Sequence, residues 1–441
     1  MHHLTSQMIL YSDLPSDSIL SCLSGIFAQW ENHSLPEEEL VAGIYAQTKR
    51  LLDLSTTLGF DRNLWQCYLA YVLVSHPNSF SLTCEQQGAT AGGTINAIAT
   101  HEMDLFLRLF HFDFSAIEAD LGIRCFSLVT SYHAIPKNEL VYHRAVSEKI
   151  LALAESIASA DGAPQVLALL SEYFRVYGMG DFGLYRAFRV AEEENKLRLL
   201  PINNLDSVVL DDLIGYETQK AQLRENMDAF VSGYPFNNTL LYGDAGTGKS
   251  TSVKAVLNEY WPRGLRVIEL YKHQFHLLSP LISMIKARRY RFVIFIDDLS
   301  FDEGEVEYKY LKAVIEGGLE TRPENIMICA TSNRRHLIKE PWKDRSDMEH
   351  DGDIHRSDTM EEKLSLSERF GCAIRYDTPD RRLFNEMVTT IALRTSGIHM
   401  SEEELLLLAN KWELRHGGVS GRCAQQFINY IAGKSLSEQN G

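Results

Sequence analysis

The chain has 441 residues, of which 45% are hydrophobic and 23% are charged, so it can form a sizeable core and is not a disordered polymer. Lys and Arg total 43 against 59 Asp and Glu, and the net charge of −16 disfavours direct binding to nucleic acid or to an anionic membrane. No apolar stretch approaches the roughly 20 residues of a membrane-spanning helix, and the seven scattered cysteines lack C-x-x-C spacing. The first residues do not resemble a secretory signal. We therefore expect a cytoplasmic protein without a membrane segment.

The first 200 residues are predicted to be helical. Apolar residues recur at three- and four-residue spacing in Ile19–Trp30, Leu40–Leu54, Leu64–Val74 and Ile150–Tyr177. Breaks are indicated at Gly88–Gly93 and at Asp161–Pro164. We expect a helical N-terminal domain over residues 1–200, ending near the connector Pro201–Asn204.

After residue 200, short apolar runs rich in β-branched residues alternate with helical stretches. The runs are Asn238–Tyr242, Leu265–Leu270, Arg291–Ile296, Asn325–Thr331 and Cys372–Tyr376. Short runs that are apolar throughout are typical of parallel strands with helices on both faces of the sheet. The sequence therefore predicts an α/β core over residues 201–378.

The rest of the chain, residues 379–441, is predicted to be helical. Ser401 precedes Glu404 by three residues ahead of an apolar run, which is a capping-box pattern, and Ser420 can cap the last helix. The polar and acid-rich stretch Lys339–Lys363 is interpreted as a solvated loop.

A glycine-rich motif follows the first predicted strand and opens a helix. It fits the pattern G-x-x-x-x-G-K-[ST] and consists of Gly243, Asp244, Ala245, Gly246, Thr247, Gly248, Lys249 and Ser250, with Thr251 next in the helix. Glycines let successive N–H groups point at phosphate oxygens, and the helix N-terminus adds partial positive charge. Lys249 supplies a full charge for the β/γ oxygens, and the Ser250 hydroxyl can bind Mg²⁺. The pattern predicts a phosphate site.

A second predicted strand, Phe292–Ile296, ends in the acidic pair Asp297-Asp298. Asp297 would hold the metal directly or through water, and Asp298 would polarise the attacking water. An acidic pair at a strand end can instead cap the following helix, but the complete phosphate loop favours the metal site.

Together these motifs resemble those of the AAA+ ATPase superfamily. The likeness spans residues 213–434 and rests on Leu213–Glu217, the phosphate loop, Phe295–Glu305, Ala330–Leu337, Leu364–Gly371 and Gly417–Arg422. The chain is similar in particular to a bacterial AAA+ family of ATP-binding proteins described as a domain of unknown function. The resemblance implies a P-loop parallel sheet, a C-terminal helical lid, ATP and Mg²⁺ as cofactors, and a homo-oligomer.

The resemblance also implies roles for three polar residues, each with a simpler alternative. Asn333 matches the first sensor, which orients the attacking water, although an Asn can also form a turn after a strand. Arg369 matches the arginine finger that is offered to a neighbouring subunit, or it forms an ion pair with Glu368 or Glu362. Arg422 matches the second sensor in the lid, or it forms a salt bridge between lid and core.

Ile214, Gly215 and Tyr216 match the segment that lines the adenine pocket, although a core aromatic is an alternative for Tyr216. The charged cluster Arg334–His336 could contact phosphate, an adjoining subunit or an acidic partner, and the sequence leaves this open.

The chain departs from the family pattern at the metal-binding strand. Asp298 stands where Glu is commoner, and its shorter side chain predicts slow turnover; Glu303 and Glu305 follow closely and are possible substitutes. Tyr271–Pro280 lacks the aromatic–apolar–glycine loop of protein-threading members. The short connection before Asn325 leaves no room for the hairpin insertion of helicase-like clades.

The leading hypothesis is an AAA+ ATPase that assembles subunit to subunit and remodels or regulates a protein partner held by its N-terminal domain. The alternative is an ATP-dependent binding switch, or a module like a helicase loader, with little intrinsic turnover. A small-molecule kinase is disfavoured by the matches at Arg369 and Arg422.

Overall fold

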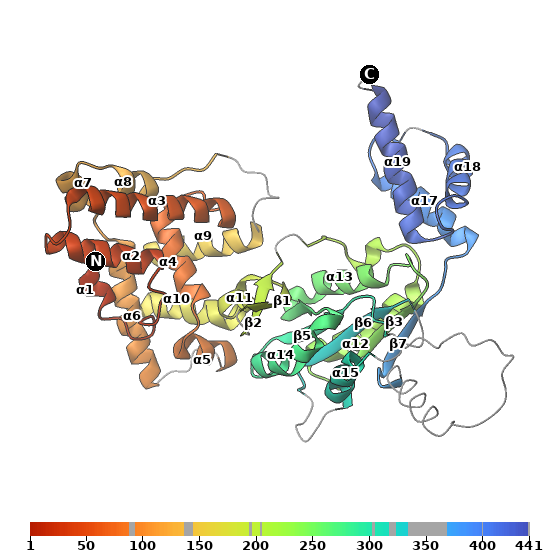
Figure 1. Ribbon diagram of the computed structural model, residues 1–441, viewed down its shortest axis with the longest axis horizontal. Coiled ribbons are helices and arrows are strands. Elements are labelled where there is room, and N and C mark those ends of the chain that lie inside the picture. Colours follow the sequence, from red (N-terminus) through yellow and green to blue (C-terminus); the bar gives the residue numbers. More distant parts are fainter. Residues whose placement is uncertain are drawn as a thin grey trace. The chain divides into compact units, whose positions relative to one another are not determined.

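The computed structural model describes residues 1–87, 93–135, 144–193, 196–202, 205–301, 305–316, 323–333, 368–398 and 400–439. The chain divides into two compact units, Met1–Tyr185 and Arg186–Gly441 (Figure 1). The predicted loop Lys339–Lys363 lies outside the described residues.

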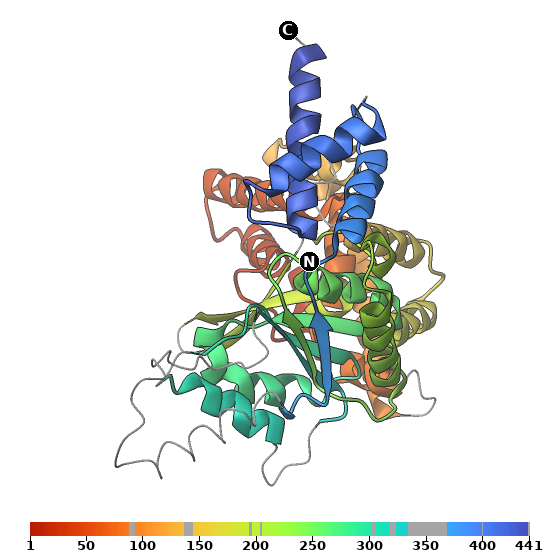
Figure 2. The ribbon, with the colours of Figure 1, turned by 90° about the vertical axis from the view of Figure 1, so that its right-hand side faces the viewer.

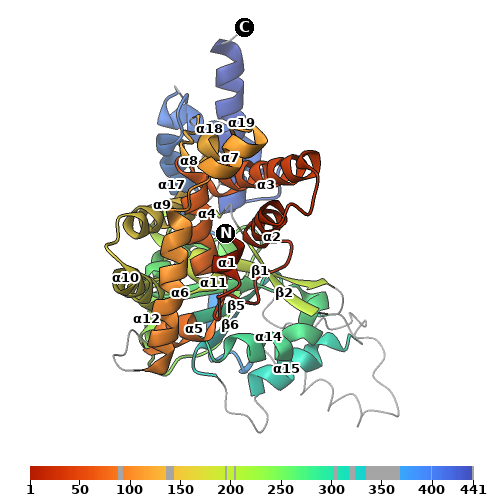
Figure 3. The ribbon, with the colours of Figure 1, turned by 90° about the vertical axis from the view of Figure 1, so that its left-hand side faces the viewer.

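The first unit is helical throughout its described residues (Figure 3). Its helices are α1 (His2–Thr5), α2 (Ile19–Glu31), α3 (Glu37–Leu58), α4 (Leu64–Ser75), α5 (Ser79–Gln87), α6 (Thr94–Phe110), α7 (Ser115–Leu121), α8 (Cys125–Thr130), α9 (Arg144–Ala158), α10 (Ala163–Val176) and α11 (Gly180–Leu184). The four predicted helical stretches are confirmed by α2, α3, α4 and the pair α9–α10, which breaks between Ala158 and Ala163 as expected.

Helix α4 forms the centre of this unit, because nine of its twelve residues are buried. The indole N–H of Trp65 donates to the carbonyl oxygen of Leu109 in α6 over 2.7 Å, so the buried ring keeps a polar partner. Phe114 packs against Trp65 edge-on at 5.5 Å and stacks on Phe126 at 4.2 Å. These aromatic contacts join three parts of the unit into one core.

The second unit is built on a seven-stranded sheet with the order β2-β1-β4-β5-β6-β3-β7. Its strands are β1 (Ala187–Glu193), β2 (Lys196–Pro201), β3 (Thr239–Gly243), β4 (Leu265–Glu269), β5 (Arg291–Ile296), β6 (Ile326–Ser332) and β7 (Cys372–Tyr376). All neighbouring pairs are parallel except β1–β2. The five predicted strands are confirmed as β3 to β7, whereas β1 and β2 were expected to belong to the helical N-terminal domain.

Helices cover both faces of this sheet (Figure 1). They are η1 (Leu210–Asp212), α12 (Glu217–Ser232), α13 (Lys249–Tyr260), η2 (Trp261–Arg263), η3 (Lys272–Leu277), α14 (Leu278–Ile285) and α15 (Glu307–Glu316). Residues of α12 and α13 share one core with inward side chains such as Leu241, Val293 and Ile374. The alternating partners Leu240 and Ile294 are also buried, on the face that carries α14 and α15. This burial on both faces explains why the strands read as continuous apolar runs.

The C-terminal lid consists of α17 (Arg381–Arg394), α18 (Glu402–Glu413) and α19 (Gly421–Gln439) (Figure 2). The predicted caps are confirmed: Ser401 Oγ accepts from the Glu404 N–H, and Ser420 Oγ accepts from the Cys423 N–H. The lid has a separate core around Phe384, Ala409, Phe427 and their neighbours. The predicted fold class, a parallel sheet with helices on both faces, a helical lid and a helical N-terminal region, is confirmed. Among the described residues, no helix combines the length and apolar character needed to span a bilayer.

Candidate functional site

A cavity of about 870 Å³ lies between the sheet and the lid in the second unit. It is lined by Val208, Asp212, Leu213, Ile214, Tyr216, Ala245, Gly246, Thr247, Gly248, Lys249, Ser250, Thr251, Asp297, Asp298, Thr331, Asn333, Met387, Ile391, Arg394, Thr395, Gly421, Arg422, Gln425 and Gln426. The size is that of a typical site for a small ligand or cofactor. The structure thus brings most of the sequence-predicted site residues to one place.

The floor of the cavity is the phosphate loop between β3 and α13. Gly246 and Gly248 have φ values of 77° and 95°, and Gly243 has a φ of 131°, a region that side chains with a Cβ rarely adopt. At Gly243 the requirement is also steric, because a Cβ there would collide with the carbonyl oxygen of Tyr376 in β7. The spacing of the motif is therefore the spacing that this backbone path requires: three glycine positions with positive φ, followed by a helix N-terminus.

Lys249 lies at the first turn of α13 and is only 6% exposed. Its ammonium donates to the carbonyl oxygens of Gly243 over 2.9 Å and Asp244 over 2.6 Å. Burial lowers the pKa of Lys249 below its usual value, and the nearby positive charge of Arg422 acts in the same direction, against the opposing effect of the surrounding carboxylates. A buried ammonium beside a second cation is a site that favours a polyanion.

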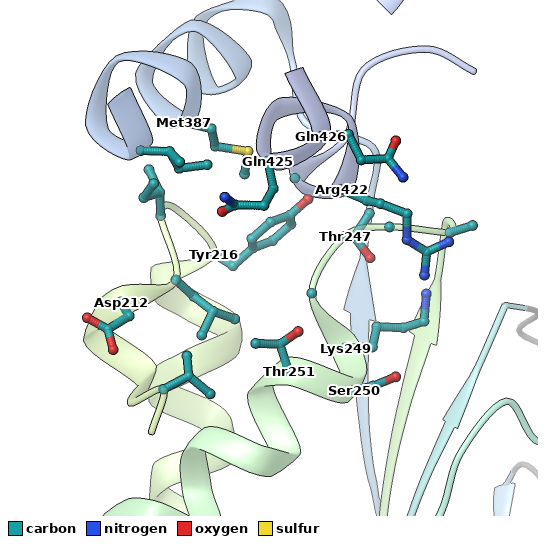
Figure 4. Close-up of a pocket in the computed structure, with 18 of the residues that line it drawn as sticks. Asp212, Tyr216, Thr247, Lys249, Ser250, Thr251, Met387, Arg422, Gln425 and Gln426 are labelled. Atoms are coloured by element: carbon teal, nitrogen blue, oxygen red, sulfur yellow. The ribbon is translucent and has the colours of Figure 1, made fainter. Parts of the chain in front are cut away.

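Arg422 reaches the same space from the lid. Figure 4 shows its guanidinium group directed toward the amine of Lys249 from the opposite side of the cavity. The main-chain N–H of Arg422 donates to the carbonyl oxygen of Gly246 over 3.2 Å, so the start of α19 rests on the phosphate loop itself. A Cβ on Gly246 would approach Ser420 Oγ to 3.0 Å, which shows how close the lid and the loop lie.

Two strand ends supply the hydroxyl and carboxylate groups beside the loop. Asp297 follows β5, and its Oδ1 accepts hydrogen bonds from Ser250 Oγ over 2.6 Å and from Thr331 Oγ1 over 2.5 Å. These bonds fix one oxygen of Asp297 next to the Ser250 hydroxyl. The side-chain oxygens of Ser250, Asp297 and Thr331 therefore lie together beside the loop, and those of Asp297 and Thr331 come from the carboxyl ends of neighbouring strands.

Asp298 has an unusual backbone conformation, with a φ of 51°, which Asp tolerates better than most residues. Its N–H donates to Thr331 Oγ1 over 3.0 Å, and its Oδ1 accepts from Asn333 Nδ2 over 2.8 Å. Asn333 follows β6, so the side chain of Asp298 is held by the end of the adjacent strand.

The opposite end of the cavity is more apolar. Ile214 and Tyr216 line it together with lid residues such as Met387 and Gln425, which lie on the lid side of the Tyr216 ring in Figure 4. Tyr216 also packs against both the sheet core and the lid core. Burial raises the pKa of Tyr216 to about 12, so its hydroxyl stays protonated and donates to the carbonyl oxygen of Asp377 over 2.8 Å.

Some sequence-predicted residues do not line the cavity. Gly215 and Gly243 shape the backbone beside it, and Asp244 directs its side chain elsewhere. Arg369, which directly precedes the buried Phe370 ahead of β7, is also not among the lining residues. Glu305 forms an ion pair with Lys272 over 2.8 Å and does not line the cavity.

Glu303 and the cluster Arg334–His336 lie outside the described residues.

Several lining residues were not among the predicted site residues, although Leu213, Thr331 and Gly421 lie in segments that carry the family resemblance. They are Val208, Asp212, Leu213, Thr331, Met387, Ile391, Arg394, Thr395, Gly421, Gln425 and Gln426. Thr331 had a usable signal, since it lies two residues before Asn333 at the same strand end. The lid residues other than Gly421 had no signal in the local pattern, because their position depends on how the lid docks on the sheet. Arg394, for example, donates to the Asp212 carbonyl oxygen over 3.0 Å across that junction.

Among solved structures, the Holliday junction branch migration motor RuvB of Thermotoga maritima is similar over 52% of this chain and 71% of its own, with 16% identity and a TM-score of 0.35. Two variants of that protein have the same identity and TM-score over 53% of this chain and 72% and 73% of theirs. No curated protein sequence matches the chain. Residues 184–435, more than half of the chain, match the family model described as "Protein of unknown function (DUF815)".

Proposed function

The chain belongs to the DUF815 family, and we propose that it is an AAA+ ATPase that binds Mg-ATP between sheet and lid and hydrolyses it slowly. The observation that carries this proposal is the convergence of Lys249 and Arg422 on one space above the phosphate loop (Figure 4). Two cations from separate parts of the unit face a helix N-terminus there, and such an arrangement suits a triphosphate.

Binding would use the main-chain N–H groups from Ala245 to Ser250 for the phosphates, with Thr251 behind them in α13. Lys249 would exchange the carbonyl oxygens of Gly243 and Asp244 for β/γ phosphate oxygens. Ile214 and Tyr216, at the apolar end of the cavity, would hold the adenine base.

The residues present fit a magnesium ion. The Ser250 hydroxyl and the Asp297 carboxylate lie side by side, joined by a hydrogen bond of 2.6 Å. Mg²⁺ is usually bound by one or two protein oxygens together with phosphates and water, and the Ser250–Asp297 pair supplies that number of protein oxygens. The ion would neutralise charge on the phosphate oxygens.

For hydrolysis, Asp298 would polarise the attacking water and Asn333 would orient it. The hydrogen bond between them, 2.8 Å long, engages one of the two oxygens of the Asp298 carboxylate. Asp298 is also one methylene shorter than a Glu. Both features favour slow turnover, and they are the observations that favour the second candidate function, an ATP-dependent binding switch or a module like a helicase loader.

We further propose that the site is shared between subunits of a homo-oligomer. Arg369 precedes β7, whereas the phosphate loop follows β3, and these strands run parallel with Cys372 opposite Thr239. Because a strand rises about 3.3 Å per residue, Arg369 and its own phosphate loop are separated by roughly 15–20 Å of strand length. An arginine in that place suits a neighbouring subunit's nucleotide better than its own.

The N-terminal unit, Met1–Tyr185, would hold the protein partner that the ATPase remodels or regulates. The net charge of −16 favours a protein partner over direct contact with nucleic acid.

The test is Mg-ATP binding and phosphate release by the full chain and by Lys249→Ala. We expect the variant to keep its fold and to lose at least about 100-fold in ATP affinity, because a charge-assisted contact to phosphate disappears. Unchanged ATP affinity in a folded Lys249→Ala variant would reject the phosphate-loop assignment. Tight binding by the wild-type chain with no phosphate release would favour the binding switch over the ATPase. Affinity capture with Asp298→Asn, which should bind ATP and hydrolyse it poorly, is the way to identify the partner.

A further inference from the structure

The lid joins the sheet through a short hinge, Asp377–Asp380, between β7 and α17. Two residues of the nucleotide-binding region hold this hinge at successive positions. Tyr216 Oη donates to the carbonyl oxygen of Asp377 over 2.8 Å. One carboxylate oxygen of Asp244 accepts from both the N–H of Thr378 over 2.8 Å and its Oγ1 over 2.6 Å.

Asp244 has a second set of contacts through its main chain. Its N–H donates to the carbonyl oxygen of Tyr376 over 3.0 Å, and its carbonyl oxygen accepts from Lys249 Nζ over 2.6 Å. The side chain of Asp244 does not line the cavity. One residue of the phosphate loop therefore contacts the phosphate-binding lysine with its backbone and the lid hinge with its carboxylate.

The contact between the Asp244 carboxylate and Thr378 is strong, although both residues are exposed. The side-chain and main-chain hydrogen bonds from Thr378 lower the pKa of Asp244 below its usual value, so the carboxylate is charged at neutral pH. Hydrogen bonds to an ionised acceptor are shorter and stronger than those between neutral groups. The neighbouring carboxylate of Asp377 is turned to Arg375 instead, with a distance of 2.6 Å.

We propose that Asp244 is a positioning residue that couples occupation of the phosphate loop to the orientation of the lid. This inference rests on the proposed function, in which the Lys249 ammonium leaves the Asp244 carbonyl oxygen for phosphate. The Asp244 carbonyl oxygen then loses the ammonium donor at 2.6 Å and keeps only the Thr247 Oγ1 donor at 2.8 Å, while the Asp244 carboxylate still holds Thr378. Any adjustment of that peptide is passed to the hinge, and from there to the first turn of α17, where Asp380 caps the helix.

The coupling can be separated from the stability of the lid. Other contacts between lid and core do not pass through Thr378, including the one from the Arg422 N–H to the Gly246 carbonyl oxygen. Thr378→Val therefore leaves the lid attached. It keeps the N–H donor and the shape of the side chain and removes the hydroxyl donor alone.

The experiment measures two quantities on the full chain, with Mg²⁺ and a fluorescent ATP analogue as the probe. One is the dissociation rate of the analogue, and the other is hydrogen exchange of residues 377–394 with and without nucleotide. For Thr378→Val we expect dissociation about five to ten times faster, from the loss of a hydrogen bond to a charged group. The protection of residues 377–394 by nucleotide should fall, while the Tm of the free protein stays near that of the wild type.

Two controls distinguish coupling from a general loosening of the hinge. Thr378→Ser keeps both donors and should behave like the wild type. Asp377→Asn removes a carboxylate from the same hinge but leaves both clamping contacts, so it should also behave like the wild type. In Asp244→Ala/Thr378→Val the effects should not add, because both substitutions remove the same contact.

Wild-type dissociation and protection in Thr378→Val would overturn the inference, provided that the wild-type chain binds the analogue. Equal effects in Thr378→Val and Asp377→Asn would also overturn it, since they would indicate nonspecific loosening. An absence of binding by the wild-type chain would overturn the proposed function together with this inference, so the two failures are distinguishable.

Discussion

The side-chain amide of Asn333 donates a hydrogen bond to Oδ1 of Asp298 over 2.8 Å, which joins the ends of two adjacent strands at the site. Asp297, the preceding residue, is held differently, by the hydroxyl groups of Ser250 and Thr331. The two neighbouring carboxylates therefore have separate supports. A change at Asn333 should disturb Asp298 without disturbing Asp297.

We expect Asn333→Ala to lower ATP turnover roughly 10- to 100-fold, because the carboxylate that would position the attacking water loses its amide partner. ATP affinity should change by less than about threefold, since the phosphate loop and the Ser250–Asp297 pair are untouched. Steady-state phosphate release and equilibrium nucleotide binding measure the two effects. An equal loss in affinity and turnover would instead make Asn333 a ground-state contact to the nucleotide.

Binding of ATP should take up protons at alkaline pH. Burial lowers the pKa of Lys249 in the free protein, so its ammonium begins to lose its proton below the pH expected of an ordinary lysine. Contact with phosphate oxygens would raise that pKa again, because a nearby negative charge favours the ammonium. Between the two values the free protein is partly deprotonated and the complex is protonated, so ATP affinity falls as pH rises through this window.

Calorimetry at pH 9 to 10 in two buffers of different ionisation enthalpy measures this uptake. The binding enthalpy should depend on the buffer at that pH and much less at pH 7. A buffer-independent enthalpy throughout would show that Lys249 keeps its proton in the free protein.

Gly243→Ala should be much more destabilising than a glycine substitution at an open position. Gly243 has a φ of 131°, and an added Cβ would collide with the Tyr376 carbonyl oxygen, which would force β3 and β7 apart. Gly264 is the matched control, because its φ is 92° and nothing lies within 4 Å of a Cβ built there. Gly264→Ala should cost about 1–2 kcal/mol from backbone conformation alone.

At Gly243 the overlap should add about 1–3 kcal/mol to that backbone cost. Urea denaturation of the two variants measures the difference. Equal free energies of unfolding would mean that β7 moves aside freely. The close approach of Gly243 to the Tyr376 carbonyl oxygen would then add nothing to the cost of the substitution.

The sequence predicts those parts of this fold whose signals are local. The apolar runs of β3 to β7 are continuous because both faces of the sheet are buried. Ser401 and Ser420 mark the N-termini of the helices that they cap. Strands β1 and β2 were missed, although Lys196-Leu-Arg-Leu199 alternates as an edge strand does. The acidic residues Glu192 and Glu193 at the end of β1, and the position of the hairpin after a long helical region, favoured a connector over a strand.

At the candidate site, residues that belong to a motif could be predicted from the sequence, whereas residues that meet through long-range packing could not. The phosphate loop and the aspartates after β5 follow from a known spacing. Thr331 lies in the segment Ala330–Leu337 that carries the resemblance, but its hydrogen bonds to the Asp297 carboxylate and to the N–H of Asp298 became visible only in the geometry. Met387 and Gln425 reach the cavity because the lid core also packs against Ile214 and Tyr216, and no local pattern encodes that contact.

If the active site is shared between subunits, Arg369 of one subunit acts on the nucleotide of its neighbour. Arg369→Ala should lower turnover by roughly 100-fold or more with little change in ATP affinity, because a finger acts mainly on the transition state. Turnover per subunit should rise with protein concentration, since association would complete the sites. Phosphate release at several concentrations, with sedimentation velocity to follow assembly, measures both effects.

The decisive form of this experiment mixes Arg369→Ala with Lys249→Ala, each nearly inactive alone. The first variant keeps its phosphate loop and the second keeps its arginine, so some interfaces of a mixed assembly would pair an intact loop with an intact finger. Part of the activity should therefore return on mixing, and a double variant that carries both substitutions in one chain should restore nothing when mixed with either. Because Arg369 precedes β7 while the phosphate loop follows the parallel strand β3, a subunit cannot easily supply both groups to one nucleotide. If the mixture stays inactive under conditions where mixed oligomers demonstrably form, Arg369 does not act on the neighbouring subunit.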